Sequence, residues 1–119
     1  MIYCNYYTLR DKIKLKKYKS NLPSGQITKK LLKKYFIGIG TVLIDIKVFK
    51  NLKFNSNYNI IGDFDFFMKI STKYHIGAIQ KPLAFYRDHS SNLSKKKIKD
   101  HILELENWIQ SNKKNFKKY

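Results

Sequence analysis

Apolar and polar residues alternate along this chain with two different periods, which predict a mixture of strands and helices. Aromatic and β-branched residues in the segment 1–8 predict a first strand. The lysine-rich segment 10–19 is expected to be an exposed loop or an edge strand. A turn follows at 21–25, where Ser24 is the expected helix N-cap, and apolar residues then recur at helical spacing over 27–36.

The pattern after residue 38 predicts six further elements. In order, they are a buried strand at 39–44, a helical turn at 45–52, a helix at 63–72, two short strands at 76–80 and 83–87 split by Lys81-Pro82, and an amphipathic helix at 97–112. The basic residues 113–119 are expected to form a frayed tail after a domain that spans 1–112. The pattern therefore predicts a mixed α/β fold, with a short mixed sheet flanked by helices and a C-terminal amphipathic helix.

Composition narrows the class of protein. The chain has 119 residues, which is enough for one domain, and its 43% of hydrophobic residues is too high for a disordered chain. No apolar run approaches the ~20 residues of a membrane helix, and no signal peptide is expected. The single cysteine, Cys4, excludes an internal disulfide framework and a metal site built from several cysteines.

The formal charge of +17 is the strongest compositional signal. It favours polyanionic partners such as nucleic acid, anionic lipid or sugar-nucleotide phosphates. Only Arg10 and Arg87 are arginines, however, whereas a protein that reads bases would be expected to use more of them. Lysine, asparagine, isoleucine and tyrosine all have A/T-rich codons, so a biased genome is an equally good explanation for part of the charge.

Two carboxylates stand among aromatic residues at the start of the predicted helix, in a chain with eight acids. Asp63 and Asp65 are two positions apart in the segment Gly62-Asp63-Phe64-Asp65-Phe66-Phe67. A carboxylate in such surroundings suits proton abstraction from a substrate. The alternative is helix capping, in which either aspartate satisfies free backbone amides.

A second candidate group follows the last predicted strand, in the segment Tyr86-Arg87-Asp88-His89. Arg87 is suited to clamping a phosphate, and His89 to ligating a metal or donating to a phosphate. The alternative is a surface ion pair beside a solvated histidine. His75 and His101 have no ligand-type neighbours at a useful spacing and are expected to be surface residues.

These segments occur in an order that resembles the acceptor-side, C-terminal half of a family 2 glycosyltransferase of the GT-A fold. The family pattern runs from a Phe-Asp/Asn-Glu loop to a Glu-Asp-aromatic-Asp-Leu helix start and a Pro-Leu-x-x-Tyr-Arg-x-His-x-x-x-x-Ser strand and loop. The matching segments are Phe54-Asn55, Gly62-Asp63-Phe64-Asp65-Phe66, Pro82-Leu83-Ala84-Phe85-Tyr86-Arg87-Asp88-His89 and Ser94. The resemblance covers about residues 2–108.

The resemblance implies roles for four residues. Asp63 matches the general base of inverting members, which deprotonates the acceptor hydroxyl as it attacks the anomeric carbon of a nucleotide-sugar. Asp65 matches a supporting acid, Arg87 a phosphate-binding or structural residue, and His89 a ligand of the diphosphate or of the divalent metal, Mn or Mg. Gly62 stands where the family usually has glutamate, which removes one acid.

Asp63-Phe64-Asp65 also spells the Asp-x-Asp signature that binds metal and sugar nucleotide in the first half of such domains. The aromatic helix that follows it favours the later, acceptor-side motif. A full family domain is about twice as long, so the resemblance implies a truncated enzyme, from a split gene, a fragmentary gene model or a degraded copy. It is expected to be inactive alone and to bind no metal alone.

The expected partners are a nucleotide-sugar donor, a glycan or lipid-linked acceptor and a separately encoded first half. The expected location is the cytoplasm, with peripheral contact at the inner face of an anionic membrane through the basic surface and the C-terminal helix. The alternative function is a small basic module that binds nucleic acid or another polyanion. Nucleic acid is the less favoured partner because the lysines are spread through every segment. A relic without function is a third alternative.

Overall fold

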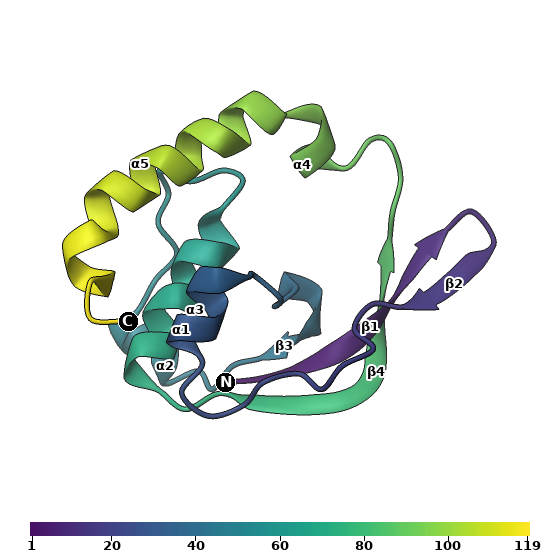
Figure 1. Cartoon of the computed structure of the whole chain (residues 1–119), viewed down its shortest axis with the longest axis horizontal. Coiled ribbons are helices and arrows are strands. Elements are labelled where there is room, and N and C mark those ends of the chain that lie inside the picture. The colour runs from purple at the N-terminus through teal and green to yellow at the C-terminus, as the bar shows by residue number, and fades with distance from the viewer.

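Strand β1 (Ile2–Arg10) is the centre of a four-stranded mixed sheet in the computed structural model, which describes residues 1–119 apart from the side chain of Ser94 (Figure 1). On one side β4 (Gly77–Arg87) runs parallel to it. On the other side β3 (Val42–Leu43) and β2 (Ile13–Lys16) pair antiparallel with its beginning and its end. The predicted mixed α/β class and short mixed sheet are confirmed.

Five helices and one 3-10 turn accompany the sheet. They are α1 (Thr28–Lys33), η1 (Ile39–Thr41), α2 (Val48–Asn51), α3 (Gly62–Lys73), α4 (Leu93–Lys96) and α5 (Ile98–Phe116). Figure 1 shows α1 beside α3, and α5 as an arc that reaches from α4 back towards these helices. The predicted C-terminal amphipathic helix is therefore confirmed. None of these helices carries an apolar stretch long enough to cross a bilayer.

The core lies between the start of the sheet and helix α3. Its aromatic and aliphatic side chains come mainly from α3, where Phe66, Phe67, Met68 and Ile70 are fully buried. Tyr3 of β1 and Leu31 of α1 pack against them, and Cys4 is buried as well. Phe66, Phe67 and Met68 are consecutive, and α3 therefore buries more than one of its sides, because successive side chains of a helix point 100° apart.

The apolar run 39–44 is not the buried strand that its composition predicts. Residues 39–41 form η1, only residues 42–43 pair with β1, and Leu43 is 76% exposed. Hydrophobic periodicity over so few residues does not distinguish a core strand from an irregular segment. The structure therefore leaves Ile39, Leu43 and Ile46 on the surface.

The two predicted strands around Lys81-Pro82 are one strand, β4. Its register against β1 shifts twice, because Cys4 faces Ile79, Asn5 faces Pro82 and Tyr6 faces Ala84. A β-bulge absorbs the extra residues and accommodates a proline that has no N–H for the ladder. The strand therefore bends instead of ending.

Two predicted helix boundaries are also wrong. Helix α1 begins at Thr28 without a side-chain cap, so Ser24 is not its N-cap. Instead, Gly25 has φ +82° and exchanges two backbone hydrogen bonds with Ile76, which fixes this segment in an extended path. At the other end, α5 continues to Phe116, whose ring packs 5.1 Å from that of Trp108, so most of the predicted frayed tail is helical.

Candidate functional site

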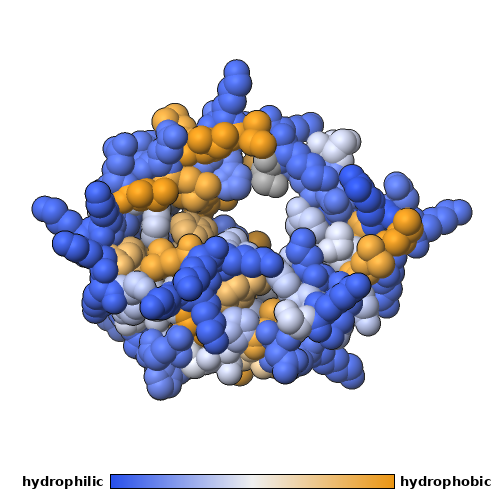
Figure 2. Space-filling model, viewed as in Figure 1, coloured by the Kyte–Doolittle hydropathy of each residue, from blue (hydrophilic) through white to orange (hydrophobic). Residues whose placement is uncertain are grey.

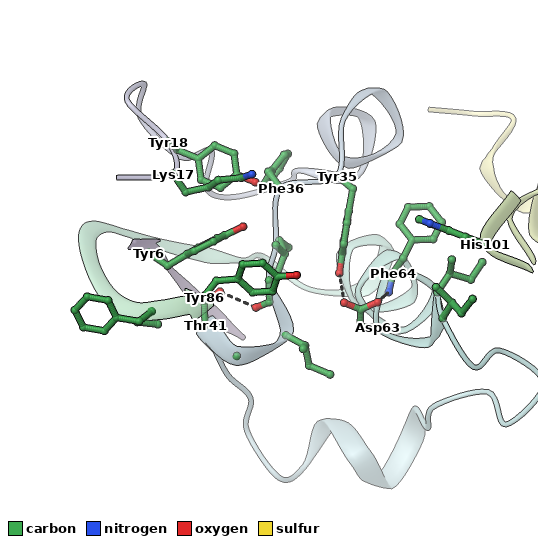
Figure 3. Close-up of a pocket in the computed structure, with 18 of the residues that line it drawn as sticks. Tyr6, Lys17, Tyr18, Tyr35, Phe36, Thr41, Asp63, Phe64, Tyr86 and His101 are labelled. Atoms are coloured by element: carbon green, nitrogen blue, oxygen red, sulfur yellow. Dashed lines mark hydrogen bonds between the residues drawn. The ribbon is translucent and has the colours of Figure 1, made fainter. Parts of the chain in front are cut away.

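A cavity of about 560 Å³ lies between the sheet, the start of α3 and helix α5. Tyr6 of β1 and Tyr86 of β4 line its sheet side, and Tyr18 lies beside them. Asp63 and Phe64 of α3 form the opposite side (Figure 3). Helix α5 contributes His101 and Leu105, and the rest of the lining comes from Lys17, Tyr35, residues 36–41, Ile60, Ile61, Ala84 and Phe85. Mainly apolar and aromatic walls with a few polar groups are typical of small-molecule sites.

Asp63 is the carboxylate of this cavity. Its position in the first turn of α3 aims the side chain towards Tyr35, whose hydroxyl donates a 2.9 Å hydrogen bond to Oδ2 (Figure 3). The backbone N–H of Phe64 donates to Oδ1 at 2.7 Å. A carboxylate has about four acceptor positions, so a substrate hydroxyl still finds acceptor capacity here. Asp63 is half-buried, which lets it reach both the protein donors and the cavity.

Burial and neighbouring groups raise the pKa of two tyrosines of the cavity, Tyr35 and Tyr6. Burial, followed by the negative charge of Asp63 and the hydrogen bond to it, raises the pKa of Tyr35 far above its usual value. Burial and the neighbouring Tyr18 likewise raise the pKa of Tyr6. Tyr35 is therefore a permanent hydrogen-bond donor to Asp63 at physiological pH. The ring of Tyr6 meets those of Tyr18 and Tyr86 edge-on at 5.9 and 6.3 Å, which fixes the orientation of this wall.

Asp65 points away from the cavity into the protein. It is 1% exposed, accepts a 2.9 Å hydrogen bond from the indole N–H of Trp108 and pairs with Lys69 at 2.6 Å. Phe64 packs edge-on against Trp108 at 4.8 Å. Asp65 therefore anchors α5 to α3. The anchored helix is the one that places His101 and Leu105 on the cavity.

Because their side chains diverge, Asp63 and Asp65 do not form a chelating pair. Nor do the described residues contain any group of three or more histidine, cysteine or acidic side chains able to hold a metal ion. A ligand role for His89 and the acceptor-side assignment of this Asp-x-Asp sequence stay predictions.

Helix capping, the alternative role for the two aspartates, holds only in part: Asp63 accepts a hydrogen bond from the free N–H of Phe64 in the first turn of α3, whereas Asp65 binds Trp108 and Lys69. The position before α3 is Ile61, and no side chain caps it from within the helix. Instead, Glu104 of α5 accepts hydrogen bonds from the N–H groups of Asn59, Ile60 and Ile61 at 2.9, 2.9 and 3.0 Å. Burial raises the pKa of Glu104, but these three donors together with His101 outweigh it and leave the pKa below its usual value. Glu104 is therefore a second anchor for α5.

Arg87 and His89 do not line the cavity. Both are exposed at the end of β4, and Asp88 between them pairs with Lys95 and, at 3.9 Å, with Arg10. Tyr86 is the residue of this motif that reaches the cavity, and its hydroxyl accepts a 2.7 Å hydrogen bond from the side chain of Asn92. The structure thus brings Asp63 and Tyr86 to one cavity and leaves Arg87 and His89 outside it.

Three cavity residues escaped the sequence analysis. Tyr35 belongs to an apolar helical stripe and looked like a core residue, and Tyr6 looked like an ordinary strand residue. His101 was expected to be a plain surface residue, whereas the structure places it, half-buried, in the lining of the cavity. The abundance of tyrosine, nine residues in 119, was the only available signal.

No protein-family model, curated protein or solved structure matches this chain. The resemblance to family 2 glycosyltransferases therefore rests on the motifs described above.

Proposed function

We propose that this chain forms the acceptor-binding side of an inverting glycosyltransferase with a GT-A-like fold, which transfers a sugar from a nucleotide-sugar to a glycan or lipid-linked acceptor. The observation that carries the proposal is the position of Asp63. The one acid that the motif assigns as general base is also the one carboxylate in the lining of the aromatic cavity. Building a surface polysaccharide or similar glycan is the corresponding biological role.

The walls of the cavity suit a saccharide. The apolar C–H faces of a sugar ring stack on aromatic side chains, and its hydroxyls need donors and acceptors at the edges of those rings. Tyr6, Tyr18, Tyr35 and Tyr86 offer both, because each carries a ring and a hydroxyl. A volume of about 560 Å³ falls within the range of roughly 300–1,000 Å³ that is usual for ligand sites.

In the proposed reaction Asp63 accepts the proton of the acceptor hydroxyl while that oxygen attacks the anomeric carbon of the donor. The bond from this carbon to the nucleoside diphosphate breaks, and the diphosphate leaves with the electron pair. Tyr35 fixes the carboxylate so that one orientation faces the acceptor. The donor nucleotide and its metal would be held by a segment other than these residues, so no step here runs through the metal.

Glycan binding tests the proposal directly. The labelled chain should bind a subset of glycans on a broad array, and Tyr6→Ala should abolish that binding. Tyr74→Ala is the matched control, because Tyr74 is a half-buried tyrosine at the opposite end of α3 from Asp63 and does not line the cavity. Binding to no glycan, or equal losses in the two variants, would contradict the proposal.

The role of Asp63 has a separate test in transfer assays that include the donor-binding segment. Asp63→Asn keeps the shape of the side chain and removes the base, so turnover should fall by about 10²–10⁴-fold. Binding of the acceptor glycan should change little. A variant that keeps normal turnover would exclude Asp63 as the base.

A further inference from the structure

Helix α5 has one broad apolar face, and only part of it is covered. Trp108, Leu105 and Phe116 pack against the rest of the protein, with Trp108 5% exposed. Along the border of this face, Ile98, Ile102 and Ile109 remain 60%, 53% and 56% exposed. Three large aliphatic side chains on one helix amount to more than the isolated apolar residues that any surface carries.

The three isoleucines form one continuous stripe. Their spacings of four and seven residues place them on the same side of the helix over three turns. Figure 2 shows apolar residues following the arc of α5 along the upper edge of the molecule, set among hydrophilic ones. The stripe is therefore a linear apolar surface with polar borders.

Positive charge predominates near this stripe, although the exposed Glu106 lies one turn from both Ile102 and Ile109. Residues 93–119 contain eight lysines and three acids, and one of the acids, Glu104, is occupied by backbone N–H groups. Lys113 lies one turn after Ile109, and both it and Lys99 are exposed. A helix with an aliphatic face and lysine borders is typical of proteins that lie on membrane surfaces.

Charge also selects among possible occupants. Two copies of a chain with a net charge of +17 repel each other, which disfavours a second copy on this face. A nucleic acid complements the positive charge, but its binding rests on phosphate contacts and does not require an exposed aliphatic stripe. An anionic bilayer complements both, because lysines reach the lipid phosphates while aliphatic side chains enter the boundary between headgroups and acyl chains.

We infer that α5 docks this protein on an anionic membrane surface, with Ile98, Ile102 and Ile109 inserted at the level of the headgroups. The helix lies in the plane of the surface along its length of about 28 Å for 19 residues. His101 and Leu105 of the same helix line the cavity, so docking would hold the cavity beside the membrane. This inference does not depend on the chemistry proposed for Asp63.

Vesicle flotation tests it on the intact chain. Phosphatidylcholine vesicles that contain phosphatidylglycerol should bind the chain, and pure phosphatidylcholine vesicles should bind it weakly. Ile98→Gln with Ile102→Gln keeps the charge and the helix propensity, and should weaken binding to the anionic vesicles about tenfold or more. The matched control is Leu43→Gln with Ile46→Gln, which removes two aliphatic side chains elsewhere that are even more exposed and should leave binding unchanged.

Any one of four results would overturn the inference. Equal binding by the α5 variant and the wild type would mean that lysines alone attract the vesicles. Equal losses in the two variants would mean that no particular face docks. A wild-type dimer in sedimentation equilibrium that the α5 substitutions dissociate would make the stripe an interface between copies. A single-stranded oligonucleotide whose affinity falls as much as that of the vesicles would point to nucleic acid as the partner. Far-UV circular dichroism checks that both variants are folded.

Discussion

Replacing Trp108 by phenylalanine tests the anchor that holds α5 over the cavity. The substitution removes the indole N–H, whose 2.9 Å hydrogen bond to Asp65 is buried at both ends. A hydrogen bond to a charged group contributes about 1.5–3 kcal/mol. The smaller ring also loses part of the contact with Phe64 and Phe116.

Lys69 limits the loss of unfolding free energy that Trp108→Phe causes. It still pairs with the other oxygen of Asp65, and its side chain is 35% exposed, so the aspartate is not left wholly without a counter-charge. The total loss of unfolding free energy should therefore be about 2–3 kcal/mol, near the middle of the range for disruptive point mutations.

Urea unfolding followed by circular dichroism is the appropriate assay, because Trp108 is the one tryptophan of the chain and fluorescence would be lost with it. A double-mutant cycle with Asp65→Asn isolates the pair and should give a coupling of about 1–2 kcal/mol. Asp100→Asn, at an exposed aspartate of the same helix, should cost less than about 0.5 kcal/mol. Additivity of Trp108→Phe and Asp65→Asn would refute the anchor.

Three further predictions follow from single contacts. Tyr35→Phe removes the hydrogen bond from Tyr35 to Asp63, which is exposed, so the unfolding free energy should fall by only about 0.5–1 kcal/mol. Glycan binding on the array should weaken nevertheless, because Asp63 loses its fixed orientation. Unchanged glycan binding would argue against a role for Tyr35. Glu104 has a lowered pKa in the folded state, so its stabilising effect is full above 4.5, the ordinary glutamate value, and disappears as the pH falls through the lower folded pKa. Glu104→Gln should accordingly be less stable than wild type at pH 7 in urea titrations, with a gap that closes in acid; a gap independent of pH would contradict this. Gly25→Ala should lower the free energy of unfolding by about 1 kcal/mol and so reduce the thermal midpoint, because Gly25 has a φ of +82° that alanine rarely adopts. No atom lies within 4 Å of the new Cβ, so backbone strain is the only cost. An unchanged midpoint would show that the turn relaxes.

The sequence predicted those features that depend on local pattern. The first strand, the amphipathic helix at the C-terminus and the acidic start of α3 all follow from spacing within one element, and the structure contains each of them. The segment 39–44 failed because apolar content does not reveal whether a neighbouring strand is available to cover it. The two strands around Pro82 are one because a bulge, which sequence patterns do not show, absorbs the irregularity.

The candidate site was predictable only in part, for a similar reason. Asp63 could be singled out because it is an acid among aromatic residues at a helix start. Tyr35, which holds it, is 28 positions away in the chain, and Trp108 is 43 positions from Asp65. Such pairs are tertiary contacts that no local period encodes. Glu104 illustrates the same point, since an acid on α5 satisfies amides that precede α3.

The most direct test of the account is to locate a bound glycan by amide chemical shifts. A glycan selected from the array is titrated into the isotope-labelled chain while the backbone amides are observed by NMR. The account predicts that the largest shifts fall on Tyr6, Tyr35, Asp63 and Tyr86, which surround the cavity. Shifts confined to the exposed lysine-rich hairpin at residues 10–16, with these four amides unmoved, would contradict it.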